Sequence, residues 1–247
     1  MNEATRERFV EHGLAEFPKE ACGLIIVRKG KEVYVPCRNM AANPERDFVI
    51  PPEDYADAED QGEIIAVAHT HPNAPARASD ADRASCEDSG LPWVILSIIQ
   101  ALDDPPVVGE IVRIEPEGFV APLVGRRFVH GVHDCYALIR DWYAQERGIT
   151  MSNPYREDEW WEKGGDMYYD NYEAEGFVEA KGAMQVGDII LMQVRSSVAN
   201  HAGVYIGDGL FLHHMYGRLS TRDVYGGYWA ELTVKIIRRA ENVDDAS

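Results

Sequence analysis

The sequence predicts an α+β protein with two domains. Its 247 residues are enough for two domains of ordinary size. Helical and strand patterns both occur along it, and they fall into two groups on either side of a stretch rich in proline and glycine, "LDDPPVVGEIVRIEPEGFVAPLVG". We therefore place a boundary near Glu115–Gly125 and expect residues 1–118 and 119–247 to fold independently.

The first group contains short apolar runs between turn residues, which predict strands, and segments with helix-start signals, which predict helices. The predicted elements are a helix over 3–17, a hairpin of Leu24–Val27 and Val33–Val35 across "RKGK", a strand over Ile64–Ala68, a helix over Ser79–Asp88 and a strand over Trp93–Ile99.

The second group begins with apolar residues at helical spacing in "DCYALIRDWYAQERG", where Gly148 is the expected C-terminal cap. Residues 153–180 are acidic and aromatic, and their pattern predicts no particular structure. Three strands are then expected over "IILMQV", "AGVYIG" and "LFLHHM".

Composition excludes several classes of function. A net charge of −18, from 24 basic and 42 acidic residues, argues against nucleic acid or anionic lipid as the main partner. The longest apolar run, "WVILSIIQAL", is too short to span a membrane, and "MNEATRERFVEHG" lacks the apolar core of a secretory signal. The four cysteines are widely spaced, so we expect free thiols rather than disulfides.

Two histidines end an apolar run in "AVAHTHPNAPARASDAD". On a strand, His69 and His71 point to the same side, and two converging imidazoles suit Zn²⁺. Asp82, in the first turn of the helix that starts at Ser79, supplies a third candidate ligand. Three protein ligands leave one position open, which is typical of a catalytic zinc site.

The same residues also fit a structural role, because "SDAD" is a helix N-terminal signal with Ser79 as the cap and Asp82 three residues later. A histidine pair alone is likewise a weak signal. The full spacing H-x-H-x₇-S-x-x-D is more specific. Glu20, in "PKEACGLI", lies just before a strand, where its carboxylate can act as a general base toward water.

On these residues the first half, roughly 1–115, resembles the JAMM/MPN family of zinc isopeptidases, whose fold is an α/β sandwich. The resemblance implies that His69, His71 and Asp82 bind Zn²⁺, that Glu20 activates water and that Ser79 helps stabilise the oxyanion. The segment "NPERDFVIPPEDY" is similar to the family's lead-in to its central helix.

A second candidate site is centred on Cys135, at the start of a predicted helix. The helix macrodipole favours a thiolate there, and the adjacent Asp134 opposes it. A nucleophilic cysteine also needs a base, for which His201 and His213 on the following strands are candidates. Alternatively, Cys135 is a buried, inert thiol and His201 is a structural histidine.

The order of this cysteine, "VGDIILM", "HAGVYIGDG" and a second histidine resembles the NlpC-type cysteine peptidases over roughly 120–247. These have a papain-like fold, and most cleave peptide bonds in bacterial cell-wall stem peptides. The resemblance implies Cys135 as nucleophile, His201 as base and His213 as third member. The family commonly has a serine after the cysteine, which helps the preceding aspartate bind the substrate amine; here Tyr136 replaces it, and Asp134 is retained.

The two domains in this order resemble the tail assembly proteins of lambda-like bacteriophages over nearly the whole chain. The resemblance implies other tail-tip proteins and peptidoglycan stem peptides as partners, and a location in the host cytoplasm during assembly or at the virion tail tip. Two hypotheses follow: an enzyme with two hydrolytic centres, or a structural or assembly module that keeps peptidase folds. We favour the enzyme, because every position of both sites holds a competent residue.

Strand parity distinguishes His213 from its neighbour His214. A two-residue turn at Asp208-Gly209 would place His214 on the face of His201, whereas a three-residue turn ending in Gly209 would place His213 there. Glycine fits the left-handed end of the longer turn, and the family's spacing also favours His213. We therefore predict the three-residue turn.

Overall fold

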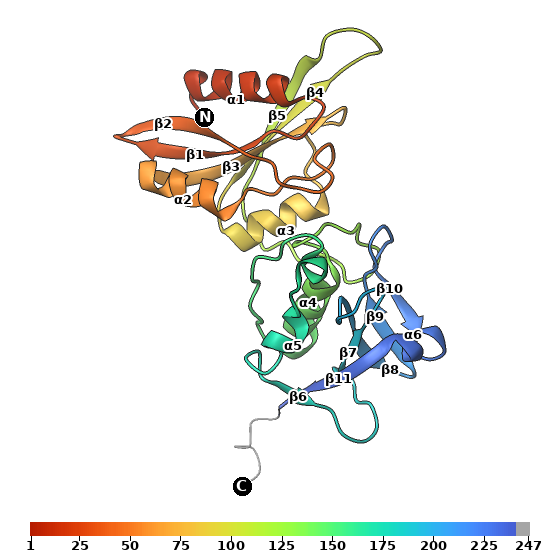
Figure 1. The fold of residues 1–247 in the computed structure, drawn as a ribbon. Helices are drawn as coiled ribbons and strands as arrows, with labels where there is room; N and C mark the ends of the chain where they lie inside the picture. The colour runs from red at the N-terminus through yellow and green to blue at the C-terminus, as the bar shows by residue number, and fades with distance from the viewer. Residues whose placement is uncertain (241–247) are drawn as a thin grey trace. The chain divides into compact units, whose positions relative to one another are not determined.

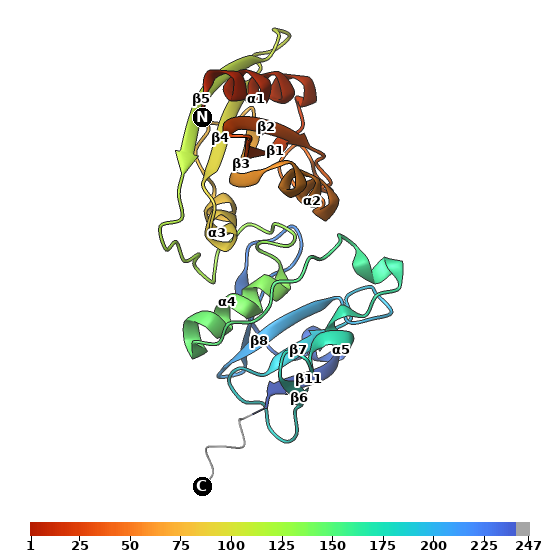
Figure 2. The same ribbon diagram turned by 90° about the vertical axis from the view of Figure 1, so that its left-hand side faces the viewer.

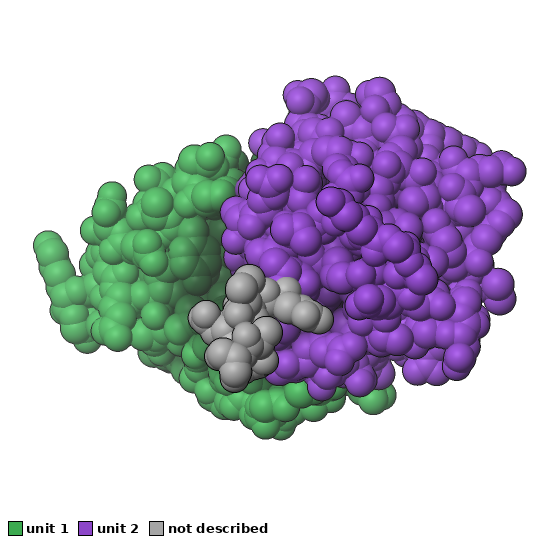
Figure 3. All heavy atoms as spheres, turned by 90° about the horizontal axis from the view of Figure 1, so that it is seen from below, with its two compact units in different colours: residues 1–120 green, residues 121–247 purple. Residues whose placement is uncertain are grey.

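The computed structural model describes residues 1–240. The chain divides into two compact units, residues 1–120 and 121–247 (Figure 3). Each unit holds one sheet with its own helices, which confirms the predicted α+β class (Figure 1). Independent folding of fragments 1–118 and 119–247 stays a prediction.

The first unit contains three helices and five strands. They are α1 (Glu3–Glu16), β1 (Cys22–Arg28), β2 (Lys31–Cys37), α2 (Pro52–Gln61), β3 (Glu63–Pro72), α3 (Asp80–Ser89), β4 (Trp93–Ile99) and β5 (Val107–Ile114). The strand order is β2-β1-β3-β4-β5, in which β3 and β4 run parallel and the other neighbours run antiparallel.

Side-chain alternation along these strands builds the three layers of the predicted α/β sandwich (Figure 2). Phe9 of α1 packs with Ala66 and Ala68 of β3 on one face of the sheet. Ala58 of α2 and Cys86 of α3 pack against the other face. The side chains of His69 and His71, offset by one from Ala68, therefore point toward the layer that contains α2 and α3.

Strand β5 lies just before the predicted boundary at Glu115–Gly125, in the stretch rich in proline and glycine, where the sequence predicted no strand. The strand pairs along β4 at the edge of the sheet. Its residues are mostly exposed or half-buried, and prolines and glycines flank it. An edge strand with little apolar burial gives a weak sequence signal.

The second unit contains α4 (Cys135–Arg147), a 3₁₀ turn at Trp160–Lys163, α5 (Met167–Asn171), β6 (Phe177–Glu179), β7 (Ile189–Met192), β8 (His201–Gly207), β9 (Leu210–His213), β10 (Thr221–Val224), α6 (Tyr228–Leu232) and β11 (Thr233–Arg239). All strand pairs are antiparallel, in the order β10-β9-β8-β7-β11-β6.

Helix α4 covers one face of this sheet, with Leu138 and Trp142 in the same core as Leu191 and Val204. Trp229 of α6 packs with Phe211 on the other face. Helix α4 is capped at its C-terminus by Gly148, as the sequence predicts. The φ of Gly148, 65°, is left-handed.

The turn between β8 and β9 differs from the prediction. Asp208 and Gly209 both have positive φ, 52° and 71°, and Gly207 pairs with Leu210, so the turn has two residues. The register then shifts between Tyr205 and Gly207, which leaves Ile206 as a bulge. Beyond this bulge Gly203 pairs with His213, which is the register that the longer turn was expected to produce.

Within residues 1–240, no helix is both long and apolar enough to cross a membrane. All four cysteines are free thiols, as the sequence predicts.

Candidate functional site

The first candidate site lies at the C-terminal end of β3. Cys22 pairs with His69, and the next pair along is held by the hydrogen bond from Thr70 N to Ala21 O at 2.9 Å. Continuing this antiparallel register places Glu20 opposite His71, and paired residues share a face of the sheet. Glu20 is buried, with 7% of its surface exposed, so it lies within this site rather than on the surface.

Asp82 reaches the two histidines from the first turn of α3. Its Oδ1 lies 3.3 Å from His69 Nε2, and its Oδ2 lies 3.5 Å from His71 Nε2. A capping box fixes this geometry: Ser79 Oγ accepts from Asp82 N, and Asp82 Oδ2 accepts from Ser79 N at 2.7 Å. The structural role of Ser79 and Asp82 is thus present together with the cluster of donor atoms.

The three donor atoms fit a zinc ion. The Nε2 atoms of His69 and His71 are 3.1 Å apart, and the Asp82 carboxylate offers Oδ1 at 3.3 Å from the first and Oδ2 at 3.5 Å from the second. A tetrahedron with metal–ligand bonds of about 2.0–2.1 Å has edges of about 3.4 Å. His71 Nδ1 lies 2.9 Å from the carbonyl of Pro75, and its N–H donates there, which leaves Nε2 with a lone pair for a metal.

Aromatic packing holds the other imidazole. The His69 ring stacks on Phe48 at a centroid distance of 4.7 Å and meets the edge of Trp93 at 5.4 Å. Its Nδ1 is buried and has no hydrogen-bond partner among residues 1–240. The orientation of this ring therefore depends on aromatic packing together with the contacts of its Nε2 to His71 and Asp82.

The electrostatics of this cluster favour an anionic carboxylate. Burial alone raises the pKa of Asp82, but the charge and hydrogen bonds of His69, His71 and Ser79 outweigh it and hold the pKa well below its usual range. Burial lowers the pKa of His69. Burial also acts to lower the pKa of His71, but the bonds to Asp82 and Pro75 and the charge of Glu20 raise it overall.

The second candidate site begins at the N-terminus of α4. Cys135 is the first helical residue and is partly buried, and Asp134 caps the helix by accepting from Ala137 N at 2.8 Å. The backbone N–H of Ala202, which follows His201 in β8, is one of the groups that lower the pKa of the Cys135 thiol. The structure therefore brings Cys135 to the start of the strand that carries His201.

The thiol of Cys135 is protonated at neutral pH. Burial and the charge of Asp134 raise its pKa to about 11, although the hydrogen bonds from Tyr168 and Ala202 act in the opposite direction. Desolvation disfavours the anion more than the helix terminus favours it, so the thiol needs a base.

The contact of Tyr168 with Cys135 was not predicted from the sequence. The Tyr168 hydroxyl lies 3.2 Å from Cys135 Sγ, and its ring packs against the core under α4. It belongs to α5, a five-residue helix in the segment for which the sequence predicted no structure. Only the high aromatic content of that segment was available as a signal.

His201 and His213 form a hydrogen-bonded pair. His201 Nε2 lies 3.0 Å from His213 Nδ1, and His213 Nε2 lies 3.1 Å from Oδ2 of Asp223 on β10. Burial and the neighbouring histidines lower the pKa of His201 to about 3. His214 points elsewhere, with Nε2 3.1 Å from the carbonyl of Arg218.

The carboxylate of Asp134, the predicted substrate-binding group, has several protein partners. Oδ2 accepts from Gly131 N at 2.9 Å and from Nε of Arg156 at 3.1 Å, and Nη2 of Arg156 lies 3.0 Å away. The same guanidinium lies over the ring of Tyr136, which stands where the family has serine. The Cζ atom of Arg156 is 4.9 Å from the centroid of that ring. The contact between Asp134 and substrate stays a prediction.

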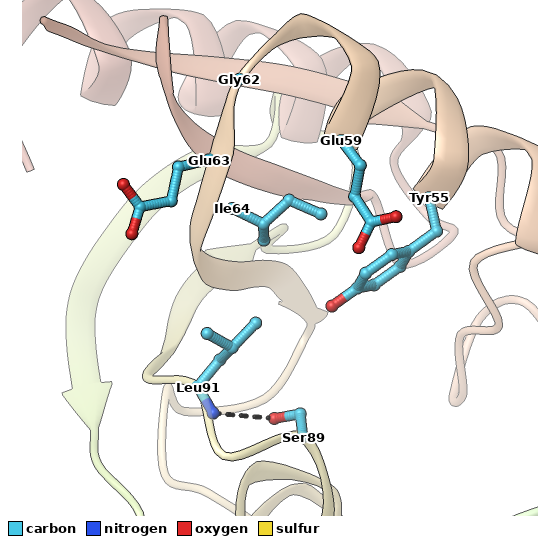
Figure 4. A pocket seen from close by; sticks show the side chains of 7 residues that line it. All are labelled: Tyr55, Glu59, Gly62, Glu63, Ile64, Ser89 and Leu91. Carbon is cyan, nitrogen blue, oxygen red and sulfur yellow. Dashed lines mark hydrogen bonds between the residues drawn. The ribbon is translucent and has the colours of Figure 1, made fainter.

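The first unit also has an open pocket of about 530 Å³ between the end of α2, the start of β3 and the end of α3 (Figure 4). Its lining residues are Tyr55, Glu59, Gly62, Glu63, Ile64, Ser89 and Leu91. None of them is a predicted site residue. Glu63 and Ile64 begin the strand that His69 and His71 end, so this pocket is separate from the histidine cluster.

Comparisons with known proteins agree with the two units. Residues 2–111 match the model described as prokaryotic homologs of the JAB domain, and residues 125–238 match the NlpC/P60 family. The fold and these matches define a protein that joins a JAB-like domain to an NlpC/P60 domain.

Two relatives extend over most of the chain. Tail tip assembly protein K of Escherichia phage N15 is 40% identical over 241 residues, 96% of this chain and 95% of that protein. Tail tip assembly protein K of Escherichia phage lambda is 42% identical over 188 residues, 76% of this chain and 87% of that protein. The chain belongs to the tail tip assembly protein K family.

Proposed function

We propose that the chain is a phage tail tip assembly protein whose second domain hydrolyses amide bonds of cell-wall stem peptides. The observation that carries this proposal is the hydrogen-bonded His201–His213 pair in β8 and β9, with Cys135 beside the backbone of the residue that follows His201. A nucleophile, a base and a third group that orients the base form the general arrangement of thiol hydrolases.

In this proposal the thiol proton of Cys135 passes to His201, and both groups are neutral before the transfer. With a thiol pKa of about 11 and a His201 pKa of about 3, both groups are uncharged at neutral pH. His201 accepts the thiol proton as Sγ bonds to the scissile carbonyl carbon, and it returns that proton to the amine as the C–N bond breaks. Water then hydrolyses the thioester, with His201 again as base, and releases the acid and the free thiol.

We also propose that the first domain is a zinc-dependent peptidase or isopeptidase. His69, His71 and Asp82 would hold the ion, which when bound supplies a Lewis acid and acidifies water. The buried carboxylate of Glu20 faces the same side of the sheet as His71 and would accept a proton from water. Ser79, as the cap of α3, would place Asp82 and help stabilise the oxyanion.

The phage role carries further proposals. By analogy with the relatives' names, other tail-tip proteins are partners, and the protein resides in the host cytoplasm during assembly or at the virion tail tip. The second candidate function is a non-catalytic assembly module. The raised pKa of Cys135, its bond to Tyr168 and the bulky Tyr136 in place of serine favour this alternative.

Digestion of purified cell-wall sacculi, with mass analysis of the released fragments, distinguishes a stem-peptide hydrolase from a non-catalytic assembly module. Wild-type protein, Cys135→Ala and Glu20→Gln are compared, with Glu16→Gln at an exposed position as the matched control. We expect stem-peptide fragments from every protein except Cys135→Ala. Release of no fragments by folded wild-type protein would support the assembly module instead.

A further inference from the structure

Asp223 is the last member of a line of hydrogen bonds that no sequence motif indicated. The line runs from His201 through His213 to the Asp223 carboxylate, with separations of 3.0 and 3.1 Å. The three residues lie on three neighbouring strands, β8, β9 and β10. Thr221 pairs with His213, and Asp223, two residues further along β10, projects from the same face of the sheet.

The surroundings of His213 fix its ring. Phe211 stacks on it at 4.4 Å, and Trp229 meets it edge-on at 4.6 Å. Opposite it, Gly203 leaves room, because a Cβ at that position would come within 2.6 Å of the Phe211 ring. With the ring held, its two nitrogens cannot exchange places, so each keeps its own partner.

The chemistry of the carboxylate then determines where the protons are. An ionised carboxylate only accepts, so Nε2 of His213 carries a hydrogen and donates to Asp223. In a neutral imidazole the other nitrogen, Nδ1, is then bare and accepts from Nε2–H of His201. His201 is also neutral, which leaves its Nδ1 with the lone pair.

We propose that Asp223 is a positioning residue that sets the tautomers of His213 and His201, so that Nδ1 of His201 is the atom that receives the Cys135 proton. This inference rests on the proposed thiol site. It goes further in assigning the accepting atom and a fourth residue, which acts through His213 and does not touch substrate.

The test uses the full-length chain with ¹⁵N-labelled histidine, in which NMR correlations report the tautomer of each ring. Wild-type protein should show both His201 and His213 protonated at Nε2. Asp223→Ala should shift both rings away from this state, whereas Asp223→Asn, whose side-chain oxygen can still accept, should retain it. Asp223 is 40% exposed, so truncation there is compatible with folding. Arg222→Ala on the exposed side of the same strand is the matched control.

A second measurement follows the alkylation of Cys135 by iodoacetamide at neutral pH, which needs no peptide substrate. Loss of one charge-assisted hydrogen bond should slow it about ten-fold in Asp223→Ala, with partial or full recovery in Asp223→Asn. Unchanged tautomers and unchanged alkylation in Asp223→Ala would overturn the proposal. If the tautomers and alkylation change as expected but wild-type protein leaves sacculi intact, the peptidase function fails and the role of Asp223 stands.

Discussion

Substitution of Asp134 can show whether its carboxylate stabilises the fold or binds substrate. Asp134→Asn keeps an oxygen for Ala137 N and so keeps the helix cap. The new amide group, however, would face Gly131 N–H and the Arg156 guanidinium, which are both donors. The substitution therefore breaks a buried ion pair while leaving the shape of the side chain unchanged.

The expected cost follows from burial. Asp134 and Arg156 have only 4% and 6% of their side chains exposed. Removing one partner of a buried pair costs about 3–5 kcal/mol, and the retained cap places Asp134→Asn near the lower limit, about 3 kcal/mol. This is about a 100-fold change in the folded-to-unfolded ratio, yet it leaves a domain of ordinary stability folded.

The pH dependence has a definite sign. Burial raises the pKa of Asp134, but Arg156 and the backbone donors outweigh it, so the folded pKa is lower than the unfolded value. The stabilisation is therefore complete above the unfolded pKa of about 3.9 and is lost as pH falls through the folded pKa. The difference between wild type and Asp134→Asn should shrink in that acid range.

Hydrogen exchange of the α4 amides in rising denaturant, resolved by mass spectrometry, measures this cost within the full chain. Asp170→Asn, the same change at an exposed position, is the control and should stay within about 0.5 kcal/mol of wild type. The double variant with Arg156→Met should recover much of the loss, because it removes the unpaired charge. A loss below about 1 kcal/mol in Asp134→Asn, together with weaker stem-peptide binding, would refute this reasoning and leave the carboxylate to the substrate amine.

Two further predictions concern the metal and the thiol. His71→Ala should reduce zinc from one ion per chain to near zero by elemental analysis, whereas His12→Ala, which alters a histidine bonded to Tyr34, should leave it unchanged; equal metal content in both variants would argue against the site. Tyr168→Phe removes a hydrogen bond that lowers the pKa of Cys135, so the pH midpoint of alkylation should rise further above about 11, while Tyr169→Phe should leave it in place. A midpoint that falls in Tyr168→Phe would contradict this account of the thiol.

Much of the fold could be predicted because its elements have strong local signals. Strands β1, β3 and β4 are apolar runs, and α3 and α4 carry a capping box and a glycine cap. Strands β6 and β10 have three and four residues, and most of these residues are exposed or half-buried, so no apolar run marks them. Edge strand β5 was missed for a related reason, since it buries little apolar surface.

The site residues divide in the same way. His69, His71 and Asp82 follow from spacing within one strand and one helix turn, so the sequence could bring them together. Asp223 and Tyr168 reach their partners only through tertiary structure: Asp223 is placed by the pairing of β9 with β10, and Tyr168 by a short helix packed on the α4 core. Neither contact has a fixed sequence offset, and pairing register is not visible in one sequence.

The thiol site also depends on a bulge at one residue, Ile206. The two-residue turn by itself would place His214 on the face of His201, and the bulge at Ile206 reverses that parity. The predicted register was right although the predicted turn was wrong. A three-residue turn, and a two-residue turn followed by a one-residue bulge, both place one extra residue between Tyr205 and Leu210.

This geometry yields a last prediction. His213→Ala leaves Nε2–H of His201 without its acceptor and should reduce Cys135-dependent cleavage about 100-fold or more, the range of general-base catalysis. His214→Ala removes a ring whose Nε2 bonds to the carbonyl of Arg218, so its effect should be mild once folding is verified by circular dichroism. Cleavage rates of both variants on stem peptides decide the matter: if folded His214→Ala is the more damaged of the two, then His213 is not the third member of the site.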